Sequence, residues 1–226
     1  MNGNELNQLD WDLKDQPDRQ AVATVSQRLT ASLRPVRALP GDGRMIWLTW
    51  GAFVILSVAL STIWGHAGFE RLTGMERAVY YAALGTFGAL FATAAVQEIV
   101  PGSRKRVGNW WVIGSCVVAL TVVASLLFRR FRMEHFVQLG LPCLITGTIA
   151  AGVIGCFIYI LTRHGYVVAP KAAGIVLGCF AGLAGVTVLA IACPIHNAAH
   201  VAVWHLGTIL VAGVAGWTIG RWRERV

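Results

Sequence analysis

Six stretches of about twenty mostly apolar residues constrain this chain more than any other feature of its sequence. They cover roughly residues 45–65, 77–99, 109–128, 136–162, 171–193 and 199–220. A helix of this length crosses the hydrocarbon core of a bilayer and satisfies its own backbone polar groups there. Residues 44–226 are therefore predicted to form an all-α, polytopic membrane bundle of six transmembrane helices, joined by short loops.

The net charge of +8 could suggest a nucleic-acid-binding protein, but the positions of the basic residues argue against that. Lys and Arg gather where the apolar stretches end, which is the distribution that orients membrane proteins. Only 13% of the residues are charged, whereas a soluble domain carries roughly 25%. We therefore expect the lipid bilayer, and no nucleic acid, to be the direct partner of this region.

Basic residues also predict the orientation, because cytoplasmic loops carry an excess of Lys and Arg. With the N-terminus in the cytoplasm, twelve basic residues fall on that side: Arg28, Arg34, Arg37, Arg44, Arg104, Lys105, Arg106, Arg163, Lys171, Arg221, Arg223 and Arg225. Five fall on the opposite side: Arg71, Arg77, Arg129, Arg130 and Arg132. We therefore expect a multi-pass inner-membrane protein with both its N-terminus and its C-terminus in the cytoplasm.

Residues 1–43 form the one predicted unit outside the membrane. Val22, Val25, Leu29 and Leu33 recur at spacings of three and four, which predicts one amphipathic helix of about four turns. A segment this short cannot bury a core alone, so its apolar stripe needs a partner: the membrane surface, a second copy or another protein. Helices that lie on membranes usually have a strongly basic polar face, whereas this segment mixes basic and acidic residues. We therefore favour a protein partner.

Cys143 and Cys193 are the most informative pair of side chains. Their midpoint, residue 168, lies in the loop between the fourth and fifth apolar stretches. Two antiparallel helices that leave one loop reach equal depth after equal numbers of residues, which places both thiols at one height, near the periplasmic surface. Pro142 and Pro194 fit a helix start and a helix end at that boundary. The remaining cysteines are interpreted as small apolar residues within the helices: Cys116, Cys156 and Cys179.

Histidines follow Cys193 closely, in the stretch that ends at His205. If a helix resumes after Pro194, His196 and His200 share one face at i, i+4, and His205 lies off that face as a packing or hydrogen-bonding residue. Cysteine and histidine at this density could hold a transition or soft metal ion. The predicted ligands are Cys143, Cys193, His196 and His200. Anchoring at the membrane interface explains the two histidines equally well.

Glycines in the last two stretches predict close helix packing. Gly174, Gly178 and Gly182 recur every four residues in the fifth stretch, and Gly216 and Gly220 have the same spacing in the sixth. Small residues at this spacing let two helix backbones approach closely.

Two features of the chain together resemble a known family. One is the run Leu33-Arg34-Pro35-Val36-Arg37 before the first apolar stretch, and the other is the pair of cysteines fifty residues apart, with Pro194 and Trp204 after the second. With the length and the six-helix layout, they make the chain similar to the NrsF-type membrane anti-sigma factors of bacteria.

This resemblance implies a protein that sequesters an extracytoplasmic-function sigma factor at the bacterial inner membrane through its cytoplasmic N-terminal segment. It also implies that Cys143 and Cys193 are sensor thiols that register metal or oxidative stress and trigger release. Val22 and Val25 belong to the apolar stripe, and the positions that the resemblance adds as sigma-binding are Leu29, Leu33, Arg34, Pro35, Val36 and Arg37.

The alternative is a membrane thiol oxidoreductase, or a metal- or haem-handling protein, that uses the same Cys and His residues. Such a protein needs a polar path or a cofactor site inside the bundle, and the sequence offers almost no polar residue to build one. A scaffold subunit also stays open, as does the oligomeric state. The chain has no paired carboxylates, nucleophile triad, phosphate loop or cofactor fingerprint. We therefore expect a regulatory binding protein rather than an enzyme.

Overall fold

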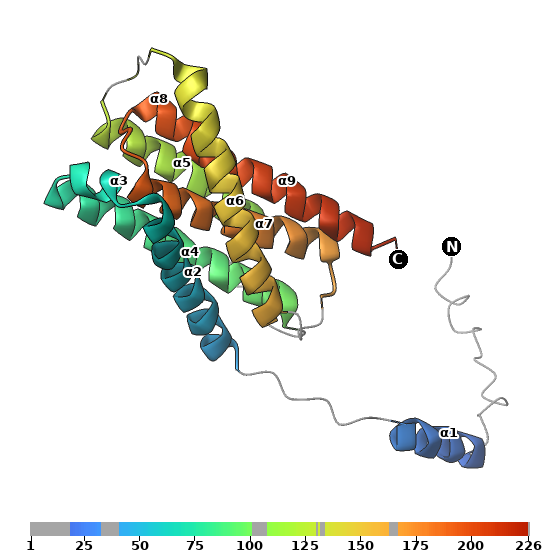
Figure 1. Cartoon of the computed structure of the whole chain (residues 1–226). Coiled ribbons are helices and arrows are strands. Elements are labelled where there is room, and N and C mark those ends of the chain that lie inside the picture. The colour runs from blue at the N-terminus through green and yellow to red at the C-terminus, as the bar shows by residue number, and fades with distance from the viewer. Residues whose placement is uncertain are drawn as a thin grey trace, which may run out of the picture. The chain divides into compact units, whose positions relative to one another are not determined.

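The computed structural model describes residues 19–32, 41–100, 108–129, 131, 134–162 and 167–225. Within these ranges every regular element is a helix, and six spans are long and apolar enough to cross a membrane (Figure 1). The first five are α2 (Asp42–Trp64), α4 (Gly74–Ile99), α5 (Asn109–Leu127), α6 (Phe136–Thr162) and α7 (Pro170–Ala192). The sixth joins α8 (Ala198–His200), the π-helix η3 (Val201–His205) and α9 (Leu206–Arg223). The prediction of an all-α bundle with six membrane helices is confirmed.

The N-terminal part is a unit of its own, residues 1–38, distinct from residues 39–226. Its described element is the helix α1 (Arg19–Ser32), which lies where the apolar stripe predicts a helix. Val22 and Val25 are exposed on it, and Leu29 belongs to its last turn. The remaining predicted sigma-binding positions lie outside the described residues: Leu33, Arg34, Pro35, Val36 and Arg37.

The helix α7 lies at the centre of the membrane unit and is its most buried span. The helices α2, α4, α6 and α9 all pack against it. Its Phe180 ring stacks on Phe53 of α2 and on Phe91 of α4, with ring centroids 5.4 and 6.4 Å apart. The outward faces of the other helices are apolar, with Ile55 and Leu126 exposed. This distribution suits a lipid surrounding, which costs an exposed apolar side chain nothing.

The helices α7 and α9 pack closely against each other through glycine. A Cβ added at Gly174 would collide with the carbonyl oxygen of Gly216, and one added at Gly182 would lie 2.6 Å from the Cα atom of Ile209. At the far end, Gly220 faces the backbone of Pro170 in the same way. The predicted close approach through small residues is confirmed.

The short helix α3 (Ala67–Arg71) and the connection from α7 to α8 meet at one end of the membrane unit (Figure 1). The Arg71 guanidinium donates a hydrogen bond to the Pro194 carbonyl oxygen (3.1 Å). The Ala198 amide donates a hydrogen bond to the carbonyl oxygen of Phe128 (3.2 Å), the residue that follows α5. Loops that the basic residues assign to one side of the membrane therefore lie at one end of the bundle.

Candidate functional site

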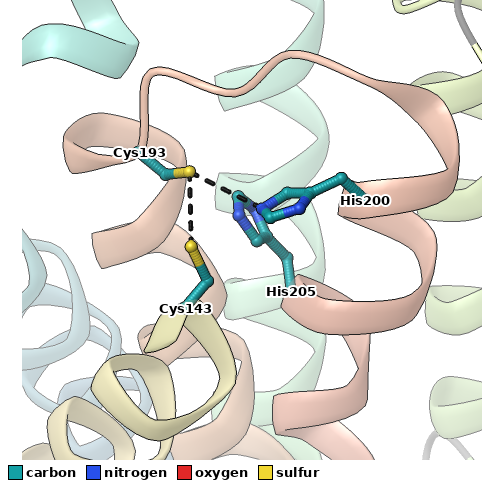
Figure 2. Close-up of side chains that lie close together, drawn as sticks. All are labelled: Cys143, Cys193, His200 and His205. Atoms are coloured by element: carbon teal, nitrogen blue, oxygen red, sulfur yellow. Dashed lines mark hydrogen bonds between the residues drawn. The ribbon is translucent and has the colours of Figure 1, made fainter. Parts of the chain in front are cut away.

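Four side chains converge at this end of the bundle: Cys143, Cys193, His200 and His205 (Figure 2). The Cys143 and Cys193 sulfur atoms are 3.5 Å apart, and the Cys193 sulfur lies 3.7 Å from Nε2 of His200. One potential ligand atom from each of the four residues lies within 4.8 Å of the others. Cys193, His200 and His205 are buried, and Cys143 is half-buried.

The two thiols come from α6 and from the residue that follows α7, and they lie at one depth and in contact. Cys193 directly follows α7, where its amide still donates to the Leu189 carbonyl oxygen (2.8 Å). Pro194 comes next and has no amide hydrogen to continue the helix, so the predicted helix end is confirmed.

Cys143 lies inside α6, and the prediction that Pro142 marks the start of that helix is wrong. The helix begins at Phe136, and Pro142 is within it. A proline there removes the hydrogen bond to the carbonyl four residues earlier and crowds that carbonyl, but it does not end the helix. The apolar residues before it extend the helix by more than a turn.

His196 is not part of the cluster. It was predicted to share a helix face with His200, but residues 193–197 are not helical, and the helix resumes only at Ala198. Asn197 is the reason: it has an extended backbone, and its side-chain oxygen accepts hydrogen bonds from the amides of Ala199 and His200. This is the usual geometry of a residue that caps a helix start. The His196 ring packs instead on Phe128, with centroids 5.0 Å apart.

His205 is the residue that sequence reasoning missed. In a regular α-helix, Trp204 would lie below His200 on the same face. In η3 the Leu206 amide donates to the Val201 carbonyl oxygen, five residues back, so the turn holds one residue more. The wider turn brings His205 below His200, with ring centroids 5.1 Å apart. The closely spaced histidines after Cys193 were the only sequence signal for it.

Trp204 is correspondingly turned toward α6. Its indole packs on the Phe136 ring, with centroids 5.4 Å apart. A Cβ added at Gly140 would overlap that indole, so a glycine is needed at this point. Trp204 therefore fills the contact between α6 and η3, while the imidazole of His205 points toward the thiols (Figure 2).

The two imidazoles of the cluster have few polar partners among the described residues. Neither ring nitrogen of His205 has a hydrogen-bond partner, and Nδ1 of His200 has none. His205 and His200 are 2% and 0% exposed. Buried polar groups without partners typically cost about 1–3 kcal/mol each. An apolar side chain would avoid that cost, so packing alone does not account for His205.

The Cys193 thiol lies against a second thiol and two imidazoles. The Cys143 thiol hydrogen bond, and then the imidazoles of His200 and His205, lower the pKa of Cys193, against the effect of burial. Outside the cluster, burial lowers the pKa of the His196 imidazole. A thiolate is the form of cysteine that attacks disulfides and binds metals. The cluster can therefore either form a disulfide, for which the sulfurs must approach to about 2.05 Å, or coordinate a metal ion. The other cysteines lie outside it.

A comparison with known families gives a match over most of the chain. The model of NrsF, the negative regulator of sigma F, matches residues 29–225. This chain belongs to the NrsF family. It is accordingly a negative regulator of a sigma factor. The match includes Leu33–Arg37 and all four residues of the cluster, whereas Val22 and Val25 lie before it. Neither the curated proteins nor the solved structures gave a match.

Proposed function

We propose that this NrsF-family protein holds an extracytoplasmic-function sigma factor at the bacterial inner membrane and releases it under metal or oxidative stress. The N-terminal segment is the grip, both termini are cytoplasmic, and the Cys143–Cys193 pair is the periplasm-facing sensor. The contact between these two thiols is the observation that carries the proposal. Their residues are fifty positions apart in the sequence, and their sulfur atoms are 3.5 Å apart. They lie within a chain whose family regulates a sigma factor.

The length and the exposed apolar residues of α1 support its role in binding the sigma factor. It has 14 residues, and isolated helices shorter than about 12–15 residues are only marginally stable in water. Val22 and Val25 expose half or more of their side chains. Contact with a sigma factor would bury them and stabilise the helix, so binding and helix formation would support each other.

The thiol pair offers a change of state that can be linked to release. Loss of two electrons and two protons to a periplasmic two-electron oxidant would join the sulfurs in a disulfide, and they would have to approach by about 1.5 Å. Cys143 is on α6 and Cys193 ends α7, so this step shifts one helix against the other. A signal can move an equilibrium only if it acts on one of the two states preferentially.

The grip is tested by substitutions on α1. Val25→Asp together with Leu29→Asp puts two carboxylates on the apolar face, and we expect it to abolish co-purification of a sigma factor from membranes while insertion stays intact. Thr24→Asp together with Gln27→Asp is the matched control, because it adds the same charge to the opposite face. The assay is affinity purification of the tagged full chain followed by mass spectrometry. A sigma factor recovered equally with both double variants would exclude this face as the grip.

A further inference from the structure

Two separations between ligand atoms in the cluster are close to those of a tetrahedral metal site. With zinc–sulfur and zinc–nitrogen bonds of about 2.3 and 2.05 Å, ideal tetrahedral angles put two sulfurs about 3.8 Å apart and a sulfur and a nitrogen about 3.6 Å apart. The corresponding separations here are 3.5 Å between the sulfurs and 3.7 Å from the Cys193 sulfur to His200. The remaining separations, including those to His205, are all no more than 4.8 Å.

We propose that Cys143, Cys193, His200 and His205 form a four-ligand site for a divalent zinc-class ion. Two thiolates and two neutral imidazoles are a common ligand set of closed, tetrahedral zinc sites. The same donors accept cadmium, whereas hard cations prefer oxygen. The site goes beyond the proposed thiol sensor, because it gives two histidines a direct role and defines the ion.

Charge balance favours a divalent ion. Binding would release the two thiol protons, and the resulting two negative charges would cancel the two positive charges of the ion. A neutral complex is the one least penalised at a buried position next to membrane-spanning helices. No carboxylate belongs to the cluster within the described part of the chain. A monovalent ion would leave a net negative charge without a partner.

The conformation of η3 gives an independent reason to assign His205 as a ligand. Single π-turns inside α-helices are rare and are often found at functional sites. This one turns toward the thiols a histidine whose ring nitrogens have no hydrogen-bond partner in the described part of the chain, and turns toward α6 the tryptophan that packs there. Coordination of the ion by one nitrogen would relieve part of the cost of burying that ring.

The experiment uses the full-length chain in detergent, reduced and stripped of metal, titrated with Co²⁺ alone and then with Zn²⁺ alone. We expect one equivalent of Co²⁺ to give the intense visible bands of a tetrahedral site with thiolate charge transfer, and Zn²⁺ to displace it. His205→Gln should weaken Zn²⁺ binding by more than the roughly 10–100-fold typical when a residue supporting a ligand is changed. His196→Gln is the matched control and should bind like wild type.

A second measurement needs no variant. Zn²⁺ should protect Cys143 and Cys193 of the wild-type chain from alkylation, as read by mass spectrometry, and should leave Cys156 unprotected. Equal Zn²⁺ affinity of the His205→Gln and His196→Gln variants, an octahedral Co²⁺ spectrum, or no protection of the two thiols would each overturn the site. Co-purification of a sigma factor, measured on the same preparation, tests the proposed function separately, since metal binding does not require that partner.

Discussion

Substitution of Gly182 by alanine probes the packing that supports the cluster. A Cβ at this position would lie 2.6 Å from the Cα atom of Ile209 and 2.9 Å from the carbonyl oxygen of Thr208. Carbon atoms pack best at about 3.5–4.0 Å, so α9 would have to move by about 1 Å. Backbone atoms cannot rotate away as a side chain can.

Overpacking of this kind typically costs about 1–3 kcal/mol, and replacing a mid-helix glycine by alanine recovers about 0.5–1 kcal/mol. The difference is about 0–2.5 kcal/mol, so Gly182→Ala should lower the free energy of unfolding by about 1 kcal/mol. Gly114 on α5 is the control, because nothing lies within 4 Å of a Cβ added there. Gly114→Ala should raise the free energy of unfolding by about 0.5–1 kcal/mol.

Both variants can be measured by unfolding the purified protein with SDS in mixed micelles, followed by circular dichroism. The sign of the effect should differ between the two positions, which no general effect of alanine on helices would produce. Equal stability of Gly182→Ala and Gly114→Ala would refute the claim that backbone contact between α7 and α9 requires glycine at residue 182.

Two further predictions concern orientation and the thiol pair. Reporter fusions at Val226 and within 66–76 should report cytoplasm and periplasm respectively, because the basic residues favour cytoplasmic ends; reversed signals would place the thiols on the wrong side for a periplasmic sensor. Either Cys143→Ser or Cys193→Ser alone should abolish the response of a sigma-dependent reporter to metal or oxidative stress as fully as both together, since residues that act as one unit are not additive. Cys156→Ser should leave the response intact, and a partial response in one single variant would argue against a shared site.

The sequence alone determined the architecture of the membrane unit. Six spans follow from stretch length and hydropathy, because a bilayer has a fixed thickness and every backbone polar group within it needs a partner. Equal depth of Cys143 and Cys193 follows from counting residues away from one loop. The close approach of α7 and α9 follows from glycines spaced four apart, of which Gly174 and Gly216 are one contacting pair.

The tertiary structure decided which side chains complete the cluster. Three departures from regular helix geometry lay beyond sequence periodicity: the helix that continues through Pro142, the cap at Asn197 and the π-turn ending at His205. Because the helix starts after the cap, His196 does not lie on the predicted helix face. Because of the π-turn, His205 rather than Trp204 lies below His200. Periodicity assumes that each residue advances the helix by the same angle. A single wider turn changes the face of every residue after it. Here it accompanies the packing of Trp204 against α6, a contact between residues far apart in the sequence.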